Sequence, residues 1–278
     1  MRHSITFTDT AASVSKNTWT DWGIIPTQVP LFQTPPVKTN FMELAGGNGR
    51  IDLTTAITGY PVYDDRTGSI SFLSPDRWTN WLSTFNAIKR FLHGQYVKVT
   101  LEDEPGWYYE GRISVNEMYC DEQHGTFTLD YELGPFAWAE SATDEPWLWD
   151  PFSFETGVIY DGVYVDISVL PPKTWQGADT AQHISVTTTA ADLEFSAQES
   201  GDAPQQPSFL ATGADVTLTI TVGTTATTKT LTNGTAAKVA GLVLYRGVWL
   251  YNGRTASVSM ATASGTATLG LTFRPGRL

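Results

Sequence analysis

Two groups of side chains have the types and spacing from which metal and catalytic sites are built. Cys120 and His124 are separated by three residues in the CDEQH segment, which suits half of a zinc site. A structural zinc ion needs four ligands, and no second pair completes the set, because the other histidines are scattered: His3, His93 and His183. We interpret the pair as an exposed turn before a strand that starts at Thr126, and we expect no metal or other cofactor.

The second group is acidic. Glu102, Asp103 and Glu104 lie opposite Glu110 across a predicted hairpin. Glycoside cleavage uses two carboxyl groups held across a sugar, one of them with a raised pKa. Carboxylates at a hairpin tip are more often solvated turn residues. Because a Gly-x-Ser-x-Gly elbow is absent and Ala45–Arg50 lacks the Gly-Lys-Ser/Thr ending of a phosphate loop, we expect a protein that is not an enzyme.

One amphipathic helix precedes this hairpin. Ser74 suits the cap, Pro75 the first helical position and Gly94 the exit. Between them, apolar residues recur at steps of three and four: Trp78, Trp81, Leu82, Phe85, Ile88, Phe91 and Leu92. This spacing predicts a helix with one buried face.

The segments around the helix follow the two-residue period of half-buried strands. Apolar residues alternate with polar ones in VKVTL after residue 96 and in TFTLDYEL after residue 125. Asp103–Gly106 has turn chemistry. Short strands are also predicted at 4–8 and 19–25, and the prolines of residues 26–40 favour an edge segment or an extended arm.

Several of these motifs, in this order, carry a resemblance. They are PPVKTNFMELAGGNGRIDLTTA, YDDRTGSISF, RFLHGQ, VKVTLEDEPGWYYEGRISV and FTLDYELGPFAW, spread over roughly residues 30–138. Together they resemble the distal tail proteins of long-tailed bacteriophages. The resemblance implies a structural virion protein that forms a homohexameric ring between the tail tube protein and the tip protein or receptor-binding proteins, with a channel through which DNA passes.

The chain of 278 residues is long enough for two domains. Residues 1–150 hold 10 Lys and Arg against 20 Asp and Glu, whereas residues 151–278 hold 7 against 9. We place the boundary in ESATDEPWLWDPFSF, which gives a ring-forming domain at 1–147 and a second domain at 148–278. The fold expected is mainly β: an N-terminal, tail-tube-like β-rich domain with one helix, then a C-terminal antiparallel β-sandwich.

The sandwich prediction rests on alternation and turns. Apolar residues alternate with threonine in VTLTITV from Val216, and Asn233-Gly234 and Asn252-Gly253 are hairpin-turn dipeptides. No helix is predicted after residue 147. The resemblance implies that this domain is galectin-like.

Charge and targeting signals limit the partners. A net charge of −12 disfavours general nucleic-acid binding, so DNA crossing a ring of this protein would pass without specific binding, repelled by acidic walls. Cys120 is the only cysteine, and the sequence predicts neither a signal peptide nor a membrane span. We expect synthesis in the host cytoplasm, incorporation into the virion at the tail tip, and no membrane association.

Adjacent aromatic residues point to a subunit contact. Trp107, Tyr108 and Tyr109 follow one another, and neighbouring strand residues face opposite sides of a sheet. At least one large ring must therefore find a partner outside the local core, either a second subunit or another part of the chain. The segment with Pro35 and Pro36 is a second candidate contact.

A sugar-binding role is the alternative function. Trp175, Trp249 and Tyr251 could form a stacking platform for a carbohydrate-binding host-surface adhesin. Trp249 and Tyr251 lie on one face of a strand, and we favour a place in the core because a Thr/Ala-rich domain needs large apolar residues there.

Overall fold

The computed structural model describes most of the chain, and the described part divides into two compact units. The first unit comprises residues 1–37 and 63–138 with Leu278, and the second comprises 38–62 and 139–277. The boundary predicted near residue 147 falls outside the described residues. Those are residues 3–10, 12–29, 32–43, 49–74, 81–120, 125–140, 158–160, 163–165, 182–195, 201–274 and 276–278.

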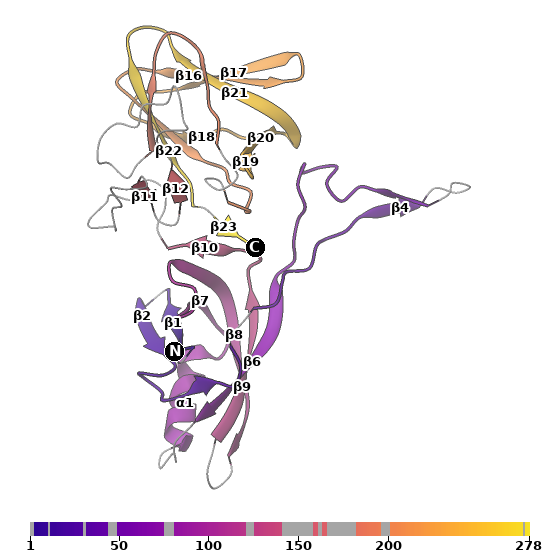
Figure 1. Ribbon diagram of the computed structural model, residues 1–278, viewed down its shortest axis with the longest axis vertical. Coiled ribbons are helices and arrows are strands. Elements are labelled where there is room, and N and C mark those ends of the chain that lie inside the picture. Colours follow the sequence, from indigo (N-terminus) through magenta and orange to yellow (C-terminus); the bar gives the residue numbers. More distant parts are fainter. Residues whose placement is uncertain are drawn as a thin grey trace. The chain divides into compact units, whose positions relative to one another are not determined.

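The first unit is built on one antiparallel sheet with the strand order β2-β1-β7-β8-β9-β6-β3, and β10 pairs with β8 (Figure 1). The predicted alternation is confirmed: Val97, Val99 and Leu101 are buried on one face. The strands are β1 (Ile5–Asp9), β2 (Val14–Asn17), β3 (Ile25–Pro26), β6 (Arg66–Ser74), β7 (Gln95–Leu101), β8 (Trp107–Cys120), β9 (Gly125–Leu133) and β10 (Ala137–Ala139).

The strand predicted at 19–25 is wrong. Residues 18–22 form a turn, in which the Asp21 carboxylate accepts a hydrogen bond from the Asn17 amide at 2.8 Å, and only Ile25 and Pro26 continue as edge strand β3. A proline at a sheet edge costs no ladder hydrogen bond.

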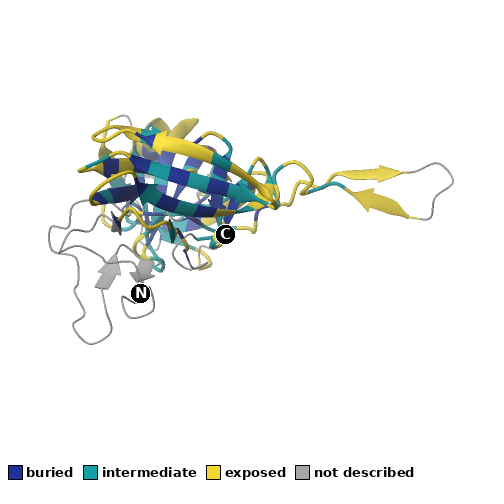
Figure 2. Ribbon diagram, turned by 90° about the horizontal axis from the view of Figure 1, so that it is seen from above, coloured by how far each residue is buried: buried dark blue, intermediate teal, exposed yellow. Residues whose placement is uncertain are grey.

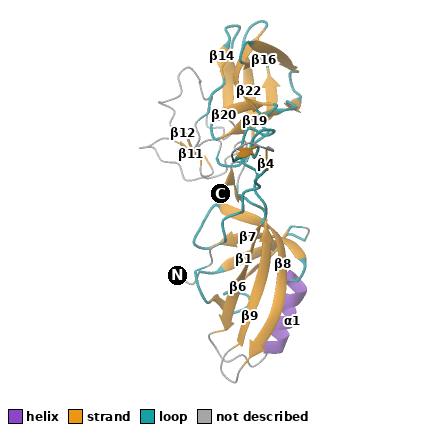
Figure 3. Ribbon diagram, turned by 90° about the vertical axis from the view of Figure 1, so that its right-hand side faces the viewer, coloured by secondary structure: helices purple, strands orange, loops and turns teal. Residues whose placement is uncertain are grey.

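The predicted helix is α1 (Trp81–Leu92), which lies against one face of this sheet (Figure 3). Ile88 and Leu92 are fully buried, and Phe85 and Phe91 are partly buried against the same core. The predicted helix start at Ser74 and Pro75 reaches into residues 75–80, which are outside the described part. Leu82 is 54 % exposed, contrary to the prediction, because at 100° per residue it falls on the flank of the apolar face.

The second unit contains two sheets that share one core. Buried residues alternate with more exposed ones along its strands (Figure 2). The predicted antiparallel sandwich is confirmed. One sheet has the order β13-β22-β15-β18, and the other has the order β17-β16-β21-β20-β19 with β14 against β21. Their bounds are β13 (Gln182–Val186), β14 (Ala191–Asp192), β15 (Ser208–Thr212), β16 (Val216–Val222), β17 (Thr225–Leu231), β18 (Ala236–Lys238), β19 (Leu242–Tyr245), β20 (Val248–Tyr251), β21 (Arg254–Thr262) and β22 (Ala267–Thr272).

The two Asn-Gly turns have different roles. Asn252-Gly253 joins β20 to β21 as a hairpin, with Tyr251 opposite Arg254. Asn233-Gly234 instead links β17 to β18, which belong to different sheets, so the hairpin predicted there is wrong. The Asn233 side chain accepts a hydrogen bond from the Gly213 amide at 3.0 Å, and the Asn233 amide donates one to the Asp215 side chain at 2.8 Å. These two bonds hold the turn by which the chain crosses from one sheet to the other.

Three short pieces complete the second unit. β11 (Val158–Tyr160) pairs with β12 (Val163–Val165), and β23 (Gly276–Arg277) carries a parallel bridge from Gly276 to Gly201. β4 (Phe41–Glu43) and β5 (Arg50–Asp52) pair with each other. We call residues 38–62, which contain β4 and β5, the arm. No helix among the described residues is long and apolar enough to cross a membrane.

Candidate functional site

The hairpin between β7 and β8 directs its three adjacent aromatic residues to opposite faces of the sheet. Tyr109 is 6 % exposed, and its hydroxyl donates to a Glu104 carboxylate oxygen at 3.1 Å. Trp107 packs partly buried against the same core. Tyr108 points to the other face, where the Lys98 ammonium lies 4.2 Å from the ring centroid. Of the three rings, Tyr108 is therefore the one directed away from the core.

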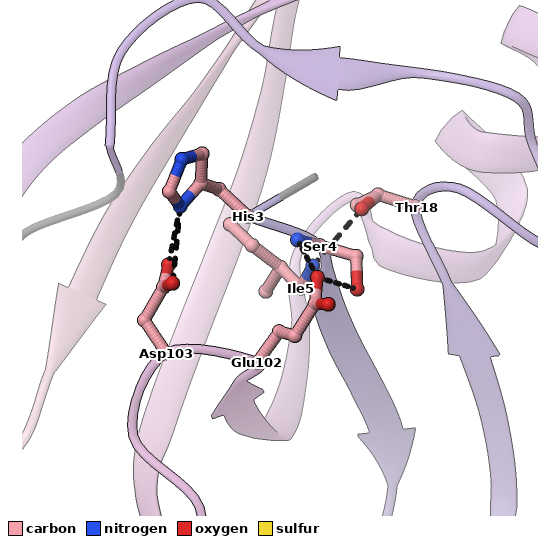
Figure 4. Close-up of polar contacts among 6 residues, drawn as sticks. All are labelled: His3, Ser4, Ile5, Thr18, Glu102 and Asp103. Atoms are coloured by element: carbon pink, nitrogen blue, oxygen red, sulfur yellow. Dashed lines mark hydrogen bonds and ion pairs between the residues drawn. The ribbon is translucent and has the colours of Figure 1, made fainter. Parts of the chain in front are cut away.

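The acidic residues of the hairpin tip hold the start of the chain in place (Figure 4). Glu102 accepts hydrogen bonds from the Ser4 amide at 2.9 Å and the Ser4 hydroxyl at 3.0 Å. The Asp103 carboxylate points at His3, whose Nδ1 lies 2.8 Å from one oxygen and 3.0 Å from the other. The bonds from Ser4, above all that from its backbone amide, hold the pKa of Glu102 below its ordinary value. A glycosidase acid needs the opposite shift.

The segment that begins at Phe32 is inserted into the core of the first unit. The Phe32 ring meets Tyr109 and Tyr131 edge to face, with ring centroids 4.6 and 5.0 Å apart. The next residue is also fixed, because the Gln33 amide donates to the Tyr131 hydroxyl at 3.1 Å. Such aromatic pairs add to the energy of area burial.

A buried arginine secures the same segment. Arg66 is 4 % exposed; its Nη1 donates to the Gln33 carbonyl at 3.1 Å and its Nε to the Pro135 carbonyl at 3.0 Å. Pro35 is buried and Pro36 is exposed, and the Asp64 amide donates to the Pro36 carbonyl at 2.8 Å. The proline-rich segment is thus held on the sheet as far as Pro36, and the extended arm begins after residue 37.

The β4–β5 ribbon of the arm is exposed on both faces (Figure 2). Met42 and Ile51 are directly opposite each other on one face and are 46 % and 41 % exposed. The other face carries Phe41, 44 % exposed, with the Arg50 guanidinium 4.8 Å from its ring centroid. Among the described strands, β4 and β5 pair only with each other. An isolated two-stranded ribbon is marginally stable in water, so this one is suited to packing against a partner.

The aromatic residues proposed as a sugar platform have other surroundings. Trp249 is 4 % exposed, and its Nε1 donates to the Leu193 carbonyl at 2.6 Å. Its ring stacks on Phe209 and meets Phe195 edge to face. Tyr251 packs partly buried against the same core, and Trp175 lies outside the described residues. The indole of Trp249 is therefore enclosed by protein on the faces where a sugar would stack.

The zinc half-site of the sequence also falls partly outside the described residues, because His124 does. Within the described part of the chain, no three or more His, Cys, Asp or Glu side chains are grouped so that they could hold a metal ion.

A solved structure similar to this chain is that of SPP1 Dit (gp 19.1), described as a paradigm of the hub adsorption apparatus in phages that infect Gram-positive bacteria. The two structures align with a TM-score of 0.49 and 10 % sequence identity, over 97 % of this chain and 98 % of the SPP1 chain. No family model and no curated protein matches the sequence. At this TM-score the likeness decides neither the fold nor the function.

Phe32, Arg66 and the exposed arm were not among the predicted site residues, and for the first two the sequence carries no signal. Phe32 stands in a proline-rich stretch, without periodic neighbours, and nothing marks Arg66 as buried. The arm does carry a signal, since the apolar runs FMEL and RIDL flank the glycine-rich AGGNG. That pattern is typical of a hairpin, but it does not indicate that the hairpin packs against no neighbouring sheet.

Proposed function

We propose that this protein is a structural component of the tail tip of a long-tailed bacteriophage. In this proposal six copies form a ring through their N-terminal units, joining the tail tube protein to the tip protein or receptor-binding proteins. The motifs shared with distal tail proteins support it, because from residue 63 onward they fall in β6, α1, β7, β8 and β9, which belong to one unit. The C-terminal sandwich would be galectin-like and lie outside the ring.

The exposure of the arm is the main observation that supports the proposed ring. Met42 and Ile51 present an apolar pair on one face of a ribbon that pairs with no other described strand. A ring needs two different complementary patches on each subunit. We assign the arm to one of them and a surface of the next copy to the other, with Tyr108 and Pro36 as further candidate contacts.

The face of the N-terminal sheet that points away from the core is consistent with DNA passing unbound. In this face Lys98 is opposite Glu110, and Arg112 is opposite Glu132, with Asp130 and several Ser and Thr residues nearby. Alternating signs give no cluster of cations with which to hold phosphates. If this face lines the channel, its mixed charge allows DNA to slide.

The test is the solution mass of the purified protein by light scattering, with negative-stain images of the species found. Sixfold rings are expected. Met42→Asp places a charge in the proposed contact; since burying a methionine side chain contributes about 1.5–3 kcal/mol, the dissociation constant per contact should rise at least about tenfold. Tyr108→Ser should weaken assembly in the same direction.

Leu210→Asp is the matched control. It introduces the same charge at a comparably exposed apolar position, 38 % exposed, in the sandwich. Rings that form with Leu210→Asp and fail with Met42→Asp support the assignment. A wild-type protein that stays monomeric, both alone and with purified tail tube protein, would overturn the ring.

A further inference from the structure

The base of the arm contacts the sandwich at the tips of two hairpins. The Tyr60 and Tyr245 rings lie with their centroids 5.2 Å apart, and Tyr245 ends β19. The backbone at Ile57–Gly59 meets the β20–β21 turn at Gly253. We call Ile57–Tyr60 together with Tyr245 and Gly253 the latch. Its two sides are almost 200 residues apart in sequence, yet both belong to the second unit.

The latch depends on the absence of side chains at two glycines. A Cβ on Gly253 would overlap the Ile57 carbonyl oxygen, and a Cβ on Gly59 would stand 2.6 Å from the Gly253 carbonyl oxygen. Both approaches are far closer than van der Waals contact, so the two backbones touch directly. Both glycines also have positive φ, +78° for Gly59 and +77° for Gly253, which glycine adopts without strain.

Backbone hydrogen bonds connect the two strands of chain that lead from the base of the arm to the β4–β5 ribbon. The Lys38 amide donates to the Val62 carbonyl at 2.8 Å where the two ends of the arm meet, and the Gly59 amide donates to Thr55 at 2.8 Å. Near the ribbon, the Leu53 amide donates to Asn40 at 2.8 Å. The chain between the latch and β4–β5 is therefore braced along its length.

We propose that the latch makes the arm and the C-terminal sandwich one mechanical element, although the arm is encoded within the N-terminal half of the sequence. A force or ligand that displaces the sandwich then displaces the β4–β5 ribbon with it. The latch itself does not require the proposed function. Its effect on assembly does rest on the proposed function: in the ring, a displacement of one copy's sandwich would move the ribbon that contacts the neighbouring copy.

The experiment compares amide hydrogen exchange, by mass spectrometry, in the full-length wild type, Gly253→Ala and Gly234→Ala. Gly234 is a matched control, because it also follows an asparagine, has φ +75° and has no atom within 4 Å of its would-be Cβ. Both substitutions impose the same backbone strain, and only Gly253→Ala collides with the arm. We expect peptides within residues 49–62 to exchange about tenfold faster in Gly253→Ala alone, equivalent to about 1.4 kcal/mol.

Tyr60→Ser separates the latch from the folding of the sandwich, because it changes the arm side only. It should also accelerate exchange in the arm, with the β21 peptides unchanged. Equal arm exchange in the wild type, Gly253→Ala and Tyr60→Ser would overturn the latch. Light scattering on the same samples keeps the two proposals apart, since a monomer whose arm exchange responds to Gly253→Ala supports the latch while it contradicts the ring.

Discussion

A methyl group added at Gly68 tests whether the core of the N-terminal unit fixes the proline-rich segment. Gly68 is opposite Tyr131 in the β6–β9 pair, and a Cβ there would overlap the tyrosine oxygen and stand 2.6 Å from Cζ. Tyr131 is 5 % exposed and touches both Phe32 and the Gln33 amide. Gly68→Ala must therefore displace this ring, and with it the anchor of residues 32–33.

Displacing the Tyr131 ring has three costs and one compensation. Overpacking a core costs about 1–3 kcal/mol, the Gln33 hydrogen bond contributes about 0.5–1.5 kcal/mol and the Phe32 ring pair about 0.5–1.5 kcal/mol. Alanine recovers roughly 0.5–1 kcal/mol relative to glycine inside a strand. The expected net loss is about 1–5.5 kcal/mol in the free energy of unfolding of this unit, measured by urea denaturation.

Two controls make the result interpretable. Gly134→Ala adds the same methyl where the nearest atom is the Glu110 carbonyl oxygen at 3.7 Å, an ordinary contact, and should cost less than about 1 kcal/mol. Tyr131→Phe removes the atom closest to the new methyl, so Gly68→Ala should cost less in that background. A neutral or stabilising Gly68→Ala, or equal costs in both backgrounds, would refute the packing argument.

Two further predictions concern the sandwich and the N-terminus. Trp249→Phe keeps a ring between Phe195 and Phe209 but leaves the Leu193 carbonyl without the indole donor, so the sandwich should lose about 1–2 kcal/mol in urea denaturation; an unchanged midpoint would contradict this. Glu102 has its pKa lowered below 4.5 in the folded state, so its contribution to stability is complete above that pH and disappears as the pH falls through the folded pKa. Glu102→Gln should flatten the fall in melting temperature below pH 4.5, and identical pH profiles would refute the role of the Ser4 bonds.

Patterns that depend on near neighbours in sequence were predictable. The two-residue period of Val97, Val99 and Leu101 determines which face of β7 is buried, whatever strand lies beside it. The helix likewise follows from its own period, and the error at Leu82 concerns only the edge of its apolar face. The opposite directions of Tyr108 and Tyr109 were also accessible, because adjacent strand residues must diverge.

Features that depend on distant partners were not predictable. Asn233-Gly234 has the same dipeptide as Asn252-Gly253, and both glycines have positive φ. One dipeptide closes a hairpin and the other crosses between sheets, because the pairing of the flanking strands with β15 and β16 decides the path of the chain. Turn chemistry specifies a reversal and not what the strands on either side will join.

The place of the arm also depends on a partner that is distant in sequence, and it matters for the proposed assembly. Its glycine-rich turn and apolar flanks predict a hairpin, but its position before β6 suggests that it belongs to the N-terminal sheet. In the structure the arm belongs to the second unit. Its backbone at Gly59 touches the backbone at Gly253, an approach that is possible only because neither residue has a Cβ. A segment braced at its base and exposed at Met42 and Ile51 does not repay its ordering entropy by internal packing. In the proposed ring, the next copy covers those two side chains and would supply the missing stabilisation, and for that reason the arm is where assembly should be tested first.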